Sequence, residues 1–149
     1  MSEIPIKMRV RETVVLRVVG KAIVPFILLF ALYVQFHGDY GPGGGFQAGV
    51  IFAGGLIFHA LIFGLDELQR AIPPVVVEIG IALGTLLYGG VGIVSMMRGG
   101  AFLDYGVLNH HSAVHGQHLG ILLIELGVGI TVTFVLVAIF YSLAGRFRQ

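Results

Sequence analysis

Four long runs of apolar residues determine what this chain can fold into. Each run has 15 to 25 residues, and all four together contain only three side chains that are acidic, basic or histidine. An α-helix rises 1.5 Å per residue, so about 20 apolar residues cross the roughly 30 Å of hydrocarbon in a bilayer. The first run, residues 22–36, extends back to residue 14 if Arg17 and Lys21 are allowed inside the helix. The runs predict an all-α integral membrane protein with four transmembrane helices, at about residues 14–36, 46–65, 75–97 and 119–143.

Composition supports this class against the alternatives. The chain has 149 residues, of which 56% are hydrophobic and 11% are charged, whereas a soluble domain is about 25% charged. Disorder requires low hydrophobicity, and a membrane barrel requires at least eight strands of alternating polarity. We therefore expect one membrane domain that comprises residues 1–149.

Several functions are excluded by what the chain lacks. It has no cysteine, so disulfides, thiolate metal sites and cysteine nucleophiles are absent. The net charge of +1 gives no basis for nucleic-acid binding. No motif for hydrolysis or dinucleotide binding is present, so we expect neither an enzyme nor a bound cofactor.

The basic residues predict the orientation in the membrane. Lysine and arginine accumulate on the cytoplasmic side. Here they gather in the first 21 residues, at Arg70 and at the C-terminal end, whereas residues 37–45 have none. We expect both termini to be cytoplasmic and the connections at 37–45 and 98–118 to be external. The first apolar run ends in Tyr33-Val34-Gln35-Phe36 without a small-residue cleavage site, so it predicts a retained helix rather than a signal peptide.

Small residues recur at four-residue spacing in the second and third helices. One series is Gly45, Gly49 and Ala53, and a second is Gly80 and Gly84. Such spacing lets helix backbones approach closely in membranes. The sequence leaves open whether these faces pack within the chain or against other subunits.

Glu125 is the strongest candidate for function. A charge in hydrocarbon requires a partner or a role, and a buried carboxyl titrates nearer to neutral pH, as a proton carrier must. Glu125 lies in the last apolar run, about 9 Å from its external end, and Gly129 at i+4 would leave room beside it. We predict a proton or cation path, or an ion pair with a neighbouring subunit. A protonated carboxyl that is hydrogen-bonded inside the bundle is the structural alternative.

Three further residues are candidates for the same path: Lys21, His59 and Glu78. Each also has a structural interpretation. Lys21, like Arg17, can extend to the cytoplasmic interface as an anchor. Glu78 lies in the first turn of a helix, where the helix dipole favours a carboxylate, and a lone histidine in a helix is commonly structural.

The external connections contain two unusual patterns. His111, His115 and His118 would share a face if that segment were helical, but without a carboxylate or cysteine nearby we expect a proton entry or subunit contact rather than a metal site. The other connection contains His37-Gly38 and then Pro42-Gly43-Gly44-Gly45-Phe46. It is not a phosphate-binding loop, because no strand precedes it and no Lys-Ser/Thr follows. We expect a rigid turn at Pro42 and glycines with positive φ.

Two of these stretches together resemble a known family. The segment Pro42–Phe46, preceded by His37-Gly38, is similar to the PGGGF signature of the B subunits (MnhB/MrpB) of multi-subunit cation/proton antiporters. The segment from Glu125 to Val132 resembles the closing signature of that family. The resemblance extends from about Val14 to Ala144, with four helices as in the family.

The resemblance implies a small, non-enzymatic subunit that contributes to assembly and to an ion path. In the family it assembles with large antiporter subunits, which are similar to the pumping subunits of respiratory complex I, and with small membrane subunits. The complex exchanges Na⁺ or another monovalent cation for H⁺ across a bacterial or archaeal cytoplasmic membrane.

Three alternatives remain open at this stage. The same module occurs in membrane-bound [NiFe] hydrogenases and related respiratory complexes. Family members often have a short His-Asn spacer before the signature, and this chain has Asp39-Tyr40-Gly41 instead, which leaves the choice between the two complexes open. A purely structural subunit without an ion path is the second alternative. A homo-oligomeric channel built on the glycine faces is the third.

Overall fold

The computed structural model of the chain describes residues 14–38, 41–109 and 112–146. This part of the chain is helical and contains no strand. Four of its helices are long and apolar enough to cross a membrane, which confirms the predicted fold class. They are α2 (Val14–His37), α3 (Gly45–Phe63), α5 (Pro74–Met97) and α6 (Ala113–Arg146).

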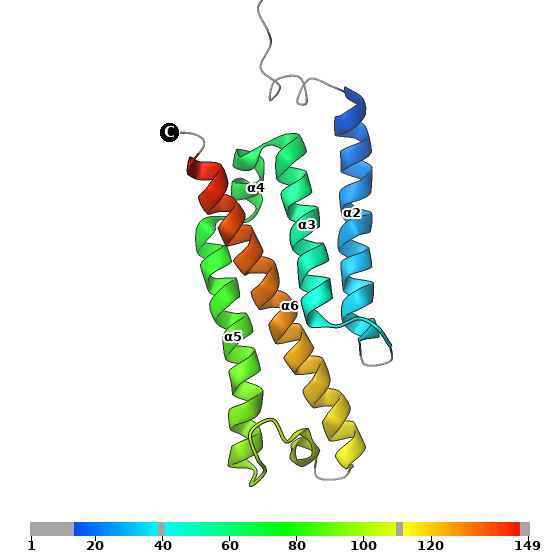
Figure 1. The fold of residues 1–149 in the computed structure, drawn as a ribbon, viewed down its shortest axis with the longest axis vertical. Coiled ribbons are helices and arrows are strands. Elements are labelled where there is room, and N and C mark those ends of the chain that lie inside the picture. Colours follow the sequence, from blue (N-terminus) through cyan, green and yellow to red (C-terminus); the bar gives the residue numbers. More distant parts are fainter. Residues whose placement is uncertain (1–13, 39–40, 110–111, 147–149) are drawn as a thin grey trace, which may run out of the picture.

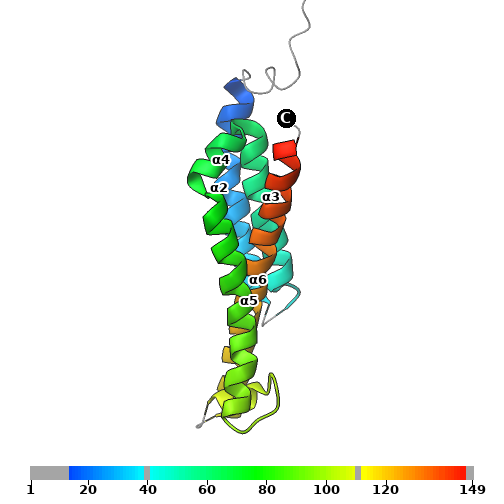
Figure 2. The ribbon, with the colours of Figure 1, turned by 90° about the vertical axis from the view of Figure 1, so that its left-hand side faces the viewer.

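The four long helices lie in a row rather than in a closed bundle (Figure 1). In space the order is α2, α3, α6, α5, and each helix packs on the next. Seen from the side, the molecule is much narrower (Figure 2). A single row leaves large apolar surfaces uncovered, for instance Phe26, Leu29 and Phe36 of α2, which are all at least 60% exposed. Such surfaces suit contact with lipid or with other membrane subunits.

Two short elements connect the long helices. α4 (Leu65–Ala71) follows α3 after Gly64, whose φ of +107° favours glycine. α4 lies at the end of the molecule where α2 begins and α6 ends, here called the terminal end (Figure 1). The opposite end, here called the loop end, carries the short 3₁₀ helix η1 (Tyr105–Leu108). The α2–α3 connection faces the same way but lies further from that end (Figure 1).

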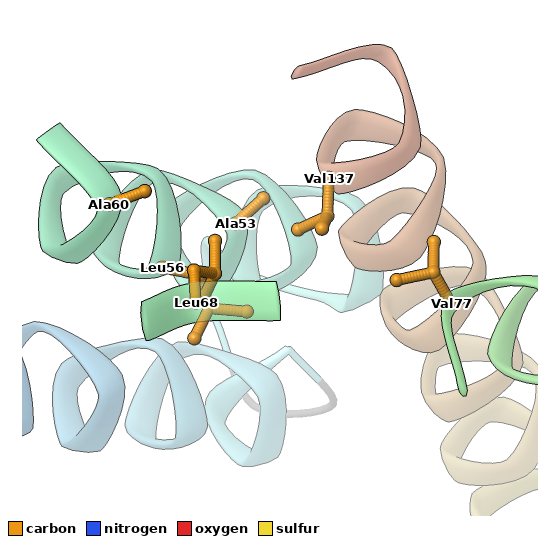
Figure 3. Close-up of a cluster of buried hydrophobic side chains, with 6 residues drawn as sticks. All are labelled: Ala53, Leu56, Ala60, Leu68, Val77 and Val137. Carbon is orange, nitrogen blue, oxygen red and sulfur yellow. The ribbon is translucent and has the colours of Figure 1, made fainter. Parts of the chain in front are cut away.

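A hydrophobic cluster joins residues of α3, α4, α5 and α6 (Figure 3). α4 contributes Leu68, which is 2% exposed, and α6 contributes the fully buried Val137. They pack with small residues of α3, including Ala53 and Ala60. The Tyr141 hydroxyl donates a hydrogen bond of 2.8 Å to the Ile72 carbonyl, which fixes the α4–α5 connection to α6.

α6 begins at Ala113, six residues before the start expected from hydropathy. Serine is an indifferent helix former, but the Ser112 hydroxyl accepts a hydrogen bond from the backbone N–H of His115 at 3.4 Å and so caps the helix. Gly116 and Gly120 let η1 pack on the first turns, because a Cβ at Gly120 would meet the Tyr105 ring. Glu125 is consequently about 18 Å from the first residue of α6, not 9 Å.

The small-residue series pack mainly within the chain. A Cβ at Gly49 would lie 2.7 Å from the Gly129 carbonyl oxygen, and a Cβ at Gly84 would lie 2.8 Å from the Gly127 carbonyl oxygen. The α3–α6 and α5–α6 contacts therefore depend on glycine on both sides. Four helix glycines, in contrast, have open space where a Cβ would stand, with no atom within 4 Å apart from the adjoining residues and the backbone of the same helix: Gly54, Gly89, Gly90 and Gly145.

Candidate functional site

The α2–α3 connection brings the two family-like sequence signatures together. Three glycines of this connection, Gly38, Gly44 and Gly45, lie against the side chain or backbone of Glu125 in α6. A Cβ at Gly38 would lie 2.7 Å from both carboxylate oxygens of Glu125, and a Cβ at Gly44 would lie 3.0 Å from one of them. A Cβ at Gly45 would overlap the Glu125 carbonyl oxygen. The glycines leave space for this carboxylate beside the loop backbone, and we call this arrangement the Glu125 site.

One glycine of the loop is required by its backbone conformation. Gly44 has a φ of +121° and precedes α3, and its carbonyl accepts the hydrogen bond of Ala48 at 3.0 Å. Its N–H donates to the Val34 carbonyl at 3.2 Å, which ties the loop to the end of α2. The expectation of positive-φ glycines after Pro42 holds for Gly44 but is wrong for Gly43 and Gly45. Gly43 is instead required by space, because its Cβ would lie 2.8 Å from the Val34 carbonyl oxygen.

The other residues of the loop motif have different surroundings. His37 ends α2, and its ring stacks on Tyr33 with a centroid distance of 5.3 Å. The N–H of Gly41 donates to the His37 carbonyl at 3.1 Å. Pro42 is exposed, and Phe46 is 61% exposed on the first turn of α3. The motif therefore has a glycine face towards Glu125 and an aromatic side chain that points away from the chain's own core.

The Glu125 site is set back from the tips of α5 and α6 (Figure 1). Twelve residues of α6 precede Glu125. On α5, the backbone at Tyr88 packs close to Gly127, and the nine residues beyond Tyr88 extend it by about 13 Å. The α2–α3 loop therefore lies beside the shafts of α5 and α6 rather than level with their ends.

Gln35 is a buried polar residue that sequence reasoning did not select as a site. It lies in α2 and is only 5% exposed. A Cβ at Gly129 would meet its side-chain oxygen, so Gln35 occupies the room that Gly129 leaves one turn from Glu125. Its Nε2 has no hydrogen-bond partner among the described residues. Its position inside an apolar run, where amides are unusual, was the only available signal.

Thr133 extends this polar line by one more turn of α6. It is 7% exposed. Its hydroxyl donates to the Gly129 carbonyl at 2.7 Å and approaches the Gly49 carbonyl at 3.3 Å. Glu125, Gln35 and Thr133 thus lie at successive levels along the contact of α6 with α2 and α3.

The structure does not gather the remaining path candidates at the Glu125 site. Lys21 is exposed on α2 and Glu78 is exposed on α5, and these helices form the two edges of the row (Figure 1). Arg17 is also exposed, as an interface anchor would be. His59 is half-buried in α3, where its ring contacts Phe63 at 4.7 Å and its Nδ1 is buried without a partner among the described residues.

The histidines at the loop end are only partly described. His111 lies outside the described residues. His115 and His118 lie in the first two turns of α6, with exposed side chains. Among the described residues, no group of three His, Cys, Asp or Glu side chains is arranged to hold a metal ion.

The connection from α5 to α6 is held by its own polar contacts. Nη1 of Arg98 donates to the Leu108 carbonyl at 2.7 Å, and the Asp104 carboxylate accepts from the N–H of Gly106 at 3.2 Å. Burial, with a smaller contribution from Tyr88, raises the pKa of Tyr105 above its usual value of 10. The Tyr105 hydroxyl therefore stays protonated at neutral pH.

These features define a multi-pass membrane protein with a carboxylate and a glycine loop set into its helix row. Comparison with known proteins then gives the family. Residues 15–138 match the family model MnhB, described as a domain related to the MnhB subunit of the Na⁺/H⁺ antiporter. The chain belongs to this family.

Relatives agree with this assignment over nearly the whole chain. The chain is similar to the putative antiporter subunit mnhB2 of Staphylococcus aureus strain Newman, with 36% identity over 134 residues. The match covers 89% of this chain and 94% of the relative. The proteins of the same name from strains COL and NCTC 8325 match to the same extent.

Proposed function

We propose that this chain is an accessory subunit of a multi-subunit Na⁺/H⁺ antiporter and contributes Glu125 to the path of a proton or cation. The observation that carries this proposal is the contact between the Glu125 carboxylate and the glycine loop. Family membership and the similarity to antiporter subunits support the cellular role. A transporter component of this kind needs no catalytic residue of its own.

The depth of the site supports a role in transport. If the bilayer is centred on the apolar part of α6, residues 119–143, Glu125 lies about 9 Å from the midplane and inside the hydrocarbon. Non-helical backbone at such depth is tolerated only where protein covers it or where it lines a water-filled cavity. The α2–α3 loop meets this requirement if other antiporter subunits enclose it with Glu125 in a hydrated path.

The other candidate residues for the ion path lie apart from the Glu125 site. Lys21, His59 and Glu78 lie closer to the terminal end than Glu125 does, so they would continue a path only together with groups from other subunits. His115 and His118 would lie at its external entry. The distribution of lysine and arginine favours cytoplasmic termini and the cytoplasmic membrane of a bacterium or archaeon.

The proposal is tested with Glu125→Gln in the complete set of antiporter subunits. Glutamine keeps the size and hydrogen-bonding capacity of the side chain but carries neither the charge nor the titratable proton. We expect Na⁺/H⁺ exchange in membrane vesicles to fall about tenfold or more, as for a group on a proton or ion path, while the purified complex keeps all its subunits. Glu67→Gln is the control, because Glu67 is exposed on α4 and forms an exposed ion pair with Arg70.

Other outcomes assign other functions. Unchanged exchange by an intact Glu125→Gln complex would show a purely structural subunit. Nickel–iron subunits that co-purify with the chain would show a hydrogenase-type complex instead of an antiporter. Ion flux through the chain alone in liposomes would indicate a self-sufficient channel.

A further inference from the structure

Between α2, α3 and α6, a pocket of about 280 Å³ opens on one face of the helix row. Its wall is almost entirely apolar, and Gln35 and Thr133 are its polar side chains. Leu32 of α2 contributes to the wall and is 45% exposed. On α6 the pocket begins at Leu126, the residue after Glu125, and extends towards the terminal end.

Gln35 places a hydrogen-bond donor without an acceptor at this pocket. Its side chain is 5% exposed, and within the described ranges its Nε2 has no hydrogen-bond partner. A buried donor without an acceptor is destabilising, most of all in an apolar environment. The Thr133 hydroxyl already donates to Gly129, and no other polar side chain of the described residues lines the pocket.

The chemistry of the wall distinguishes between occupants. A lipid chain would fill the apolar volume but offers no acceptor to Gln35. A buried water needs two to four polar partners, and this wall supplies few. A transmembrane helix can present apolar side chains together with one polar side chain, and such polar groups commonly join helices in membranes.

We infer that the pocket receives a transmembrane helix of another antiporter subunit, which inserts apolar side chains and offers one hydrogen-bond acceptor to Gln35. In the isolated chain Nε2 of Gln35 is covered, so the side chain turns towards the pocket when the helix binds, and such rotamer changes are common at interfaces. This inference rests on the proposed function, because it takes the other subunits as partners. The contact would cover the face of α2 and α6 beside the Glu125 site. Gln35 would thus act in subunit recognition rather than in transport.

The first test is Gln35→Met, which keeps the length of the side chain and removes the donor. If the acceptor comes from another subunit, the isolated chain should be equally or more thermostable, because an unpaired buried amide is removed. In the complex, the amount of other subunits that co-purify with the tagged chain should fall about fivefold or more. A structural role within the chain would instead lower the melting temperature of the isolated chain, and that result would overturn the inference.

A second pair of variants tests the pocket itself. Leu32→Trp fills the pocket mouth and should reduce co-purification, whereas Leu29→Trp on the same helix should not, because Leu29 does not line the pocket. The chain has no cysteine, so Leu32→Cys allows specific cross-linking, which we expect to join this chain to another subunit. A cross-link to a second copy, or full assembly with both Gln35→Met and Leu32→Trp, would overturn the inference. If the wild-type chain co-purifies with no antiporter subunit, the proposed function fails instead.

Discussion

Gly38 and Glu125, 87 positions apart in the sequence, are in direct contact across the α2–α6 boundary. The two carboxylate oxygens of Glu125 lie where a side chain at position 38 would begin, each 2.7 Å from the place that a Cβ would take. The glycine at the end of α2 is thus explained by the carboxylate in the middle of α6. The following predictions test this contact and the packing that maintains it.

Gly38→Ala should displace the Glu125 carboxylate from the loop. The added methyl group would lie well inside contact distance of both oxygens, so the side chain must rotate or the loop must shift. We expect Na⁺/H⁺ exchange in vesicles to fall severalfold while the chain still inserts. Gly54→Ala is the matched control, since a Cβ there would meet no atom from the rest of the chain within 4 Å, and equal losses in both variants would contradict the explanation.

Gly45→Ala should separate α3 from α6. Its Cβ overlaps the Glu125 carbonyl, and a backbone atom cannot move aside as a flexible side chain can. Overpacking of this kind lowers the free energy of unfolding by about 1–3 kcal/mol. Unfolding of the purified chain in detergent measures the loss, and Gly89→Ala, in open space on α5, should leave stability unchanged within about 0.5 kcal/mol.

Tyr141→Phe should destabilise the terminal end. The substitution removes the hydrogen bond to the Ile72 carbonyl and leaves that carbonyl without this donor. A loss of about 1 kcal/mol in the free energy of unfolding is expected. Tyr33→Phe is a suitable control because Tyr33 is 59% exposed, and a larger effect there than at Tyr141 would contradict the prediction.

Arg98→Ala should loosen the connection between α5 and α6. Arg98 donates to the Leu108 carbonyl at 2.7 Å and the Val107 carbonyl at 3.5 Å, so its loss frees the segment around η1. Backbone amides of residues 99–109 should exchange hydrogen about tenfold faster. Arg70→Ala should have little effect anywhere, because its ion pair with Glu67 is exposed, and unchanged exchange in Arg98→Ala would contradict the assigned role.

The sequence predicted local features well where local chemistry decides them. Continuous hydropathy indicated the four helices, and the predicted start of the third helix near Val75 agrees with α5, which begins at Pro74 after Pro73. Hydropathy indicated the wrong start for α6, because Ser112 and the glycines at 116 and 120 act through a cap and through contact with η1. Neither the cap nor the contact with η1 changes the mean hydropathy of the segment, so hydropathy does not detect them.

The residues of the candidate site also differ in how far the sequence alone identified them. Glu125 was identified from its charge in an apolar run, since burial of a carboxylate is unfavourable in any fold. Gln35 was missed because a neutral amide gives a weak signal in a sequence. Two observations single out Gln35: its side chain fills the space beside Gly129, and its Nε2 has no partner among the described residues. Both become visible only when α2 is placed beside α6.

By itself, the sequence determined that this chain crosses the membrane four times and that Glu125 and the glycine loop are exceptional in it. Those properties follow from the cost of placing charge and open backbone in hydrocarbon, which is the same for every arrangement of the helices. Only the tertiary structure decided that the loop and Glu125 form one site and that the helices stand in an open row. Contacts between distant segments depend on the shape of packed surfaces, and glycine at 38, 45 and 129 is what allows these surfaces to meet.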